Sequence, residues 1–125
     1  MATVETAWKD QGVSDAGFPS VSVDAVPTAF GAGCMLLDVR EDDEWELGHA
    51  PGAVHIPLVD VPARLEDVDI EAEVYVICRN GGRSRVASEF LVGLGYDVVN
   101  VNGGMVAWQS AGRSVVTDTG GPGVV

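Results

Sequence analysis

The chain of 125 residues is poor in cysteine: it has only Cys34 and Cys78, and they form no Cys-x-x-Cys pair. Without closely spaced cysteines, neither a disulfide framework nor a zinc site is indicated. No apolar run approaches the roughly 18 residues that a membrane-spanning helix needs, and the N-terminal stretch lacks the basic and apolar regions of a secretory signal. These features predict a cytoplasmic protein that uses no metal and no other cofactor.

Basic residues are also scarce, because seven Lys and Arg stand against 19 Asp and Glu, for a net charge of −12. A surface of this charge repels polyanions, so nucleic acid and anionic membranes are not expected as partners. Three of the few cations, Arg79, Arg83 and Arg85, nevertheless lie close together in the sequence. Any one of them could pair with a surface acid. Together they indicate a site that attracts a small anion.

The order of apolar and helix-like segments predicts the fold class. Five short apolar runs are expected to be strands, at residues 20–23, 35–39, 53–56, 74–78 and 98–101. Candidate helices alternate with them, at residues 24–30, 42–47, 61–65, 84–94 and 105–110. This alternation is typical of an α/β fold with a five-stranded parallel sheet flanked by helices on both faces.

The length suits one domain, and the 46% of apolar residues is typical of a folded chain. Residues 20–116 are expected to form that domain. Residues 1–19 show no sustained periodicity and are expected to be an irregular or partly helical lead-in. The glycine-rich residues 117–125 are expected to form a flexible tail.

The segment CRNGGRS, residues 78–84, joins an expected buried strand to a helix for which Ser84 is a suitable N-cap. Gly81 and Gly82 permit positive φ values, which allow successive backbone N–H groups to turn into one concavity. In open parallel sheets, ligands bind beyond the carboxyl ends of the strands, where both Asp38 and Cys78 are expected to emerge. The loop is therefore predicted to bind an anion.

Cys78 is predicted to be the catalytic nucleophile. Its sulfur would face the loop amides, the positive end of the following helix, Arg79 and Arg83, all of which favour the thiolate. A free cysteine has a pKa of about 8.5, and such surroundings lower it to roughly 3.5 to 7.5, so no histidine base is required. A single cysteine at a strand end is more often a small buried hydrophobe. The coincidence of glycines, arginines and a capped helix favours the nucleophile.

The spacing within the loop narrows the chemistry. A phosphatase-type loop needs one more residue between cysteine and arginine, and this chain has Ser84 where that arginine would stand. A tighter ring should hold one terminal sulfur atom better than a phosphate, which favours a persulfide on Cys78. The residues expected to surround the outer sulfur and bind the substrate are Arg79, Asn80, Gly81, Gly82, Arg83 and Ser84.

The loop resembles the active-site loop of the rhodanese-like domains. Residues 36–58, LLDVREDDEWELGHAPGAVHIPL, resemble the N-terminal signature of that family, and residues 101–115, VNGGMVAWQSAGRSV, resemble its Gly-Gly and Trp signature. The resemblance covers roughly residues 20–116. It implies a thiosulfate-type sulfurtransferase with a ping-pong reaction, in which Cys78 takes a sulfane sulfur from a small anionic donor and passes it to cyanide or a thiol.

The resemblance also implies roles for the neighbouring charges. Arg79 and Arg83 would orient the anionic donor, whereas Asp38 and Arg40 would support the loop without reacting. Arg113 and Ser114 depart from the more apolar pair of the family, so packing there is expected to differ. None of these assignments follows from composition or periodicity.

Two other functions compete with small-molecule sulfur transfer. The chain could be a persulfide-carrying module of a sulfur relay that acts on a protein partner, since its acidic surface suits a basic one. An arsenate-reductase or phosphatase activity is disfavoured by the short loop and by the lack of a nearby resolving cysteine.

Several other residues receive structural interpretations. Cys34 is expected to be a packed or idle cysteine, and His49 and His55 to brace a turn. The acidic residues 41–44 are expected to face solvent in a first helical turn. Trp45 and Trp108 are expected to be core or lid aromatics.

Overall fold

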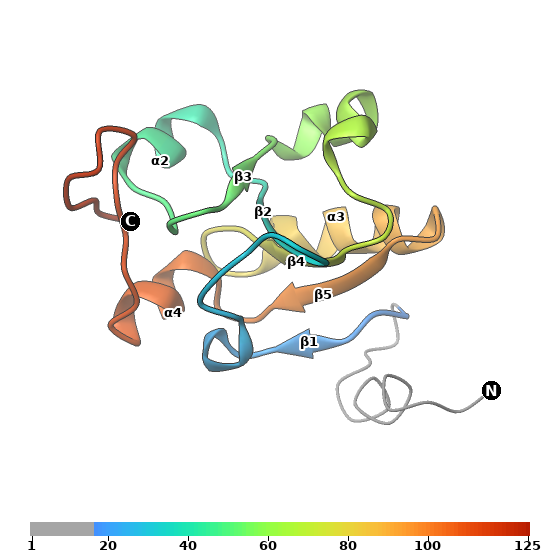
Figure 1. Ribbon diagram of the computed structural model, residues 1–125, viewed down its shortest axis with the longest axis horizontal. Helices are drawn as coiled ribbons and strands as arrows, with labels where there is room; N and C mark the ends of the chain where they lie inside the picture. Colours follow the sequence, from blue (N-terminus) through green and yellow to red (C-terminus); the bar gives the residue numbers. More distant parts are fainter. Residues whose placement is uncertain (1–16) are drawn as a thin grey trace.

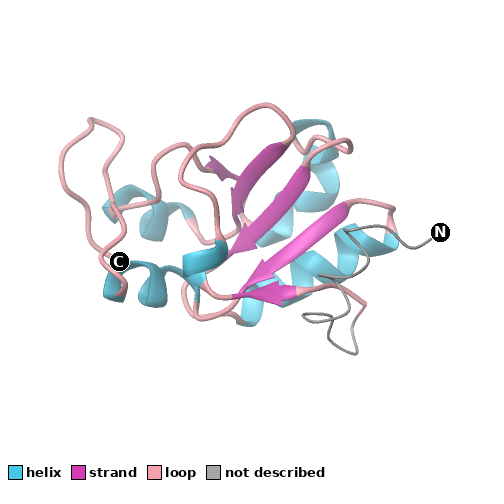
Figure 2. Ribbon diagram, turned by 60° about the horizontal axis from the view of Figure 1, so that its bottom comes forward, coloured by secondary structure: helices cyan, strands magenta, loops and turns pink. Residues whose placement is uncertain are grey.

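The computed structural model describes residues 17–125, so most of the expected lead-in at residues 1–19 lies outside the described part. One sheet has the strand order β1-β5-β4-β2-β3. Its strands are β1 (Ser20–Val21), β2 (Cys34–Asp38), β3 (Val54–His55), β4 (Glu73–Ile77) and β5 (Asp97–Val101). All neighbouring strands are parallel, as their arrows in Figure 2 show. The predicted five-stranded parallel sheet is confirmed.

Helical segments cover both faces of this sheet (Figure 1). The helix α3 and the 3₁₀ segment η2 pack on one face, and the 3₁₀ turn η1 and the helix α4 pack on the other. The short helix α2 follows strand β2. The bounds are η1 (Val23–Ala25), α2 (Asp42–Leu47), η2 (Leu58–Asp67), α3 (Gly82–Gly93) and α4 (Gly104–Ser110).

Strand β4 shows why a buried strand can be predicted from an apolar run in the sequence. Val74 and Val76 pack toward α3, whereas Tyr75 and Ile77 pack toward α4. Successive side chains of a strand point to opposite faces, so a strand covered on both faces needs apolar residues at every position. The central strand therefore appears in the sequence as a continuous apolar run.

The predicted helix at residues 24–30 is wrong. Only a single 3₁₀ turn, Val23–Ala25, forms there. The next residue is Val26, which is extended at φ −80° and ψ 132°. It precedes Pro27, and a residue before proline is driven out of the α-helical region by the proline ring. The turn therefore ends, and the chain crosses toward strand β2 as a loop.

The C-terminal residues, expected as a flexible tail, run beside α2 in the structure (Figure 1). Val124 N donates to Leu47 O at 3.0 Å, and Gly123 N donates to Val115 O at 2.8 Å. Gly48 lies so close to this segment that a Cβ there would stand 2.6 Å from the Val124 backbone. Among residues 17–125, no helix has the length and apolar character to cross a membrane.

Candidate active site

Two adjacent strands deliver the central residues to one edge of the sheet. Strand β4 ends at Ile77, so Cys78 follows it directly, and strand β2 ends at Asp38, which pairs in register with Ile77. A hydrogen bond from Val39 N to Ile77 O, 3.0 Å long, continues this pairing past the strand ends. Because the strands are parallel, both segments leave the sheet at its carboxyl edge.

The turn between β4 and α3 depends on Gly81. Gly81 is the N-cap of α3, with φ 121° and ψ −13°, a conformation that residues with a Cβ rarely adopt. Its N–H donates to Cys78 Sγ at 3.1 Å, so the turn brings a backbone donor to the sulfur. The predicted helix start at Ser84 is wrong, because the glycine conformation allows the helix to begin at Gly82.

The sulfur of Cys78 is enclosed. Cys78 is only 1% exposed. The Oγ of Ser84 lies 3.4 Å from Cys78 Sγ, 3.2 Å from Gly81 O and 2.7 Å from Asn100 Oδ1. Ser84 therefore directs its hydroxyl into the site from the first turn of α3. Arg79, Asn80 and Gly82 are exposed at the rim of the loop.

Asn100 is a site residue that the sequence reading missed. It is fully buried in strand β5 and hydrogen-bonded to Ser84. Its Nδ2 lies 3.3 Å from Ser20 Oγ and 3.4 Å from Asn102 Oδ1. A buried amide needs hydrogen-bond partners, so an asparagine within an apolar strand indicates a polar contact at that position.

Arg83 is paired with Glu44 of helix α2. The Nη1 and Nη2 of Arg83 donate to the two carboxylate oxygens of Glu44 at 2.6 and 2.9 Å. This bond lowers the pKa of Glu44 to about 2 and raises the pKa of Arg83. Asp42 and Asp43 are exposed, as the interpretation of the acidic run requires, but Glu44 turns toward the loop instead.

Asp38 and Arg40 form a buried ion pair, in which Arg40 Nη2 lies 2.8 Å from Asp38 Oδ2. The Arg40 side chain is 1% exposed and the Asp38 side chain 0%. Arg40 also donates to the main-chain oxygens of Gly48, at 2.8 Å, and Glu44, at 3.4 Å. A buried pair of this kind is stable only when its remaining donors are also satisfied. The pair therefore ties α2 to the sheet edge, and α2 in turn presents Glu44 to Arg83.

Helix α4 supports the loop from the other side. Met105 N donates to Cys78 O at 2.8 Å, and Val106 N donates to Arg79 O at 2.9 Å. Gly104 permits this approach, because a Cβ at that position would lie 2.4 Å from Cys78 O and 2.5 Å from the Arg79 carbonyl. The pair Gly103-Gly104 at the start of α4 therefore lets the helix begin against the backbone of the loop.

The two histidines make main-chain contacts. A ring nitrogen of His49 lies 2.9 Å from Trp45 O, and one of His55 lies 2.7 Å from Arg40 O. Both rings stack on the Trp45 indole, at centroid distances of 3.6 and 4.7 Å. The turn-bracing interpretation is confirmed. Cys34 is half-buried at the start of β2, and burial raises the pKa of its thiol.

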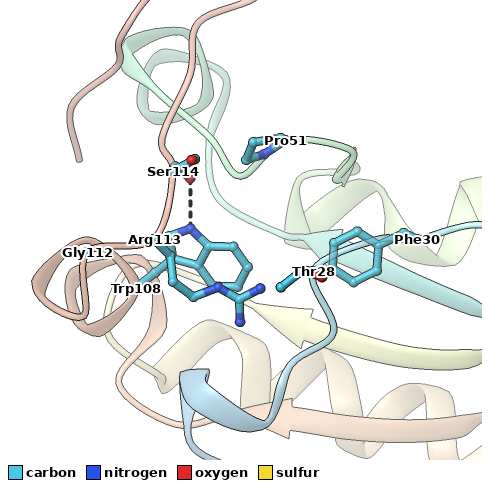
Figure 3. A pocket seen from close by; sticks show the side chains of 7 residues that line it. All are labelled: Thr28, Phe30, Pro51, Trp108, Gly112, Arg113 and Ser114. Atoms are coloured by element: carbon cyan, nitrogen blue, oxygen red, sulfur yellow. Dashed lines mark hydrogen bonds between the residues drawn. The ribbon is translucent and has the colours of Figure 1, made fainter.

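A separate cavity of about 270 Å³, shown in Figure 3, lies beside Trp108 and Arg113. The Arg113 guanidinium stands 3.9 Å from the Trp108 ring centroid. It also donates to the main-chain oxygens of Val23, Val26 and Pro27 at 2.6 to 2.8 Å. Arg113 therefore closes the η1 turn against α4, which explains a charged residue at a position expected to be apolar.

The fold and the cysteine loop agree with the comparison to known families. The model of the Rhodanese-like domain matches residues 22–111, which is more than half of the chain. The protein therefore belongs to the rhodanese-like domain family.

Individual relatives carry sulfur-related names. The chain is 46% identical over 74 residues to the Bacillus subtilis (strain 168) protein named "Putative sulfurtransferase YtwF", covering 59% of this chain and 72% of that protein. It is 43% identical over 74 residues to "Putative sulfur carrier protein YrkF" of the same organism, covering 58% of this chain but only 40% of that protein. A rhodanese-related protein from Thermoplasma volcanium has a similar structure, with a TM-score of 0.66, 33% identity and coverage of 70% and 87% of the two chains.

Proposed function

We propose that this protein is a sulfurtransferase that carries a sulfane sulfur as a persulfide on Cys78. The observation that carries the proposal is the enclosed Cys78 sulfur, which accepts a hydrogen bond from Gly81 N where α3 begins. A helix N-terminus stabilises negative charge, on a thiolate and equally on the outer sulfur of a persulfide. The names of the relatives support sulfur transfer as the general chemistry.

Thiosulfate is the proposed model donor. The Cys78 thiolate attacks the outer sulfur, a new S–S bond forms, and the S–S bond of thiosulfate breaks as sulfite leaves with the bonding electron pair. The outer sulfur of the persulfide then bonds to cyanide or a thiolate, and Cys78 departs again as a thiolate. No external oxidant or reductant enters either step.

Intact-mass measurement after thiosulfate treatment tests this proposal. The protein should gain the mass of one sulfur atom, lose it on addition of cyanide and release thiocyanate. Cys78→Ser should show neither change, whereas Cys34→Ser should behave as the unchanged protein because Cys34 lies at the opposite end of strand β2 from Asp38. Undiminished thiocyanate formation by Cys78→Ser would rule out the persulfide mechanism.

A sulfur relay to a protein acceptor is the second candidate, and an apolar groove beside the loop favours it. The groove, of about 230 Å³, is lined by Leu58, Val59, Val61, Pro62, Val86, Ala87 and Phe90. Val86 lies in the first half of α3, close to the loop, and is 58% exposed, while Val59 is 79% exposed. Exposed apolar side chains gathered in one groove are typical of a docking surface.

The proposed occupant is an acceptor protein whose cysteine is flanked by apolar and basic residues. Asp60 and Glu89 are exposed and stand next to groove residues in the sequence, as does the exposed Arg85, so acids outnumber bases beside the groove. A basic partner would therefore be attracted and an acidic one repelled.

Peptide acceptors test this occupant. Sulfur transfer from protein that carries the Cys78 persulfide to a Lys- and Leu-flanked cysteine peptide should exceed transfer to an Asp- and Leu-flanked one. Asp60→Asn/Glu89→Gln should remove that preference, Val59→Ser should slow transfer to both peptides, and neither variant should change thiocyanate formation. Equal rates for both peptides in the unchanged protein would contradict the proposed occupant.

A further inference from the structure

We propose that Glu44 sets the donor specificity of the loop by neutralising Arg83, so that alkyl or protein persulfides are preferred over dianionic thiosulfate. This inference rests on the proposed sulfurtransferase function and names the class of its donor. Arg83, in the first turn of α3, is already bound to the Glu44 carboxylate within the protein.

The Glu44–Arg83 pair is held in place from several sides. Both terminal nitrogens of Arg83 bond to both carboxylate oxygens of Glu44, at 2.6 and 2.9 Å. Glu41 N donates to Glu44 Oε1 at 3.0 Å in a capping box, which restricts the carboxylate further. Helix α2 itself is tied to the sheet by Arg40. Bidentate pairing of this kind leaves the guanidinium little freedom to turn toward a ligand.

The charge that a donor meets is therefore smaller than the sequence suggests. Glu44 offsets Arg83, and the other loop arginine, Arg79, is exposed to solvent, where charges act weakly. The backbone N–H of Gly81 still faces the sulfur and suits one terminal sulfur atom. Thiosulfate brings two negative charges, whereas a persulfide brings at most one. Loss of the attraction by Arg83 therefore weakens the binding of thiosulfate more than that of a persulfide.

Sulfur transfer from an alkyl hydropersulfide to Cys78 needs no oxidant or reductant. The Cys78 thiolate attacks the outer sulfur of an alkyl hydropersulfide, a new S–S bond forms on Cys78, and the old S–S bond breaks. The donor leaves as a thiolate with the bonding electrons, and the proton stays on the transferred sulfur or passes to that thiolate.

The experiment compares Glu44→Gln with Asp43→Asn. The two variants change the net charge equally, but Asp43 is exposed to solvent, whereas Glu44 is bonded to Arg83 of the loop. The donors are thiosulfate and the hydropersulfide of 2-mercaptoethanol, each with cyanide as acceptor. Glu44→Gln should raise kcat/KM for thiosulfate about tenfold, mainly through KM, because removing a like charge near an anion of this kind is worth about that factor. The value for the hydropersulfide should stay within about twofold.

Two controls make the result specific. Higher salt should reduce the thiosulfate gain of Glu44→Gln, since the freed Arg83 charge is partly exposed and becomes screened. The double variant Glu44→Gln/Arg83→Gln should lose the gain altogether. A merely structural role for Glu44 would lower the rates with both donors and produce no gain.

The inference is overturned if Glu44→Gln lowers thiosulfate turnover, or if Asp43→Asn raises it equally. Failure of the proposed function has a different signature, which is that unchanged protein forms no persulfide on Cys78 with either donor. Thermal unfolding of each variant confirms that the rates refer to folded protein.

Discussion

The hydroxyl of Ser84 donates to the side-chain oxygen of Asn100 across 2.7 Å, joining α3 to β5 directly behind Cys78. The Asn100 oxygen can only accept, so the hydroxyl proton points away from Cys78 Sγ, 3.4 Å distant. The lone pairs of Ser84 then face the sulfur and suit a thiol or the neutral inner sulfur of a persulfide. Because it accepts this hydrogen bond, Asn100 prevents the Ser84 hydroxyl from donating to a Cys78 thiolate.

Asn100→Leu should make Cys78 react faster with an alkylating reagent. Without its acceptor on β5, the Ser84 hydroxyl can turn and donate to the Cys78 thiolate, and a bond to a charged group is worth about 1.5 to 3 kcal/mol. The measurement is the rate of iodoacetamide alkylation of Cys78 at neutral pH, with Asn100→Leu/Ser84→Ala as the control that should lose the gain. Slower alkylation of Asn100→Leu would contradict this orientation of the hydroxyl.

Arg40→Met should destabilise the fold strongly. It would leave the Asp38 carboxylate fully buried without its partner, which typically costs about 3 to 5 kcal/mol of unfolding free energy. The double variant Asp38→Leu/Arg40→Met should recover much of that loss, because no buried charge remains. Urea unfolding measures both, and equal losses in the two variants would refute the ion-pair explanation.

Gly104→Ala should disturb the loop as well as the fold. Its Cβ would meet the backbone of Cys78 and Arg79 at 2.4 to 2.5 Å, so α4 and the loop must separate. Gly112→Ala is a matched control, because Gly112 also has positive φ, at +80°, but nothing within 4 Å of a Cβ. Both substitutions carry backbone strain of roughly 1 to 2 kcal/mol. Only Gly104→Ala should lose more stability than this and also slow persulfide formation.

Glu44 should make stability depend on acid pH. Its pKa is lowered from 4.5 to about 2 in the folded protein, chiefly by the hydrogen bond from Arg83. A depressed carboxyl pKa stabilises the fold above the unfolded value, and this contribution is lost as pH falls from about 4.5 toward 2. Glu44→Gln should therefore lose less thermal stability than unchanged protein as the pH falls from about 6 to about 2, through the interval between the two pKa values. Because the pair is partly exposed, the difference should be modest.

The strand pattern and the cysteine loop were predictable because their causes are local. Strand β4 is covered on both faces, so its positions from Val74 to Ile77 are apolar or aromatic, and the turn after it needs the glycine at position 81. Two predictions of helix bounds were wrong because one neighbouring residue was left out of account. Pro27 stops the expected helix after one turn, and the freedom of Gly81 allows α3 to start at Gly82 before the expected cap.

By itself, then, the sequence determined the parallel sheet, the glycine turn and the cysteine at the end of a buried strand, since each follows from residues adjacent in the chain. Only the tertiary structure decided which groups surround that cysteine. Glu44 reaches Arg83 across 39 positions, and Asn100 reaches Ser84 across 16. Charge and polarity patterns cannot reveal such partners, because parallel strands bring together at one edge segments that lie far apart in sequence.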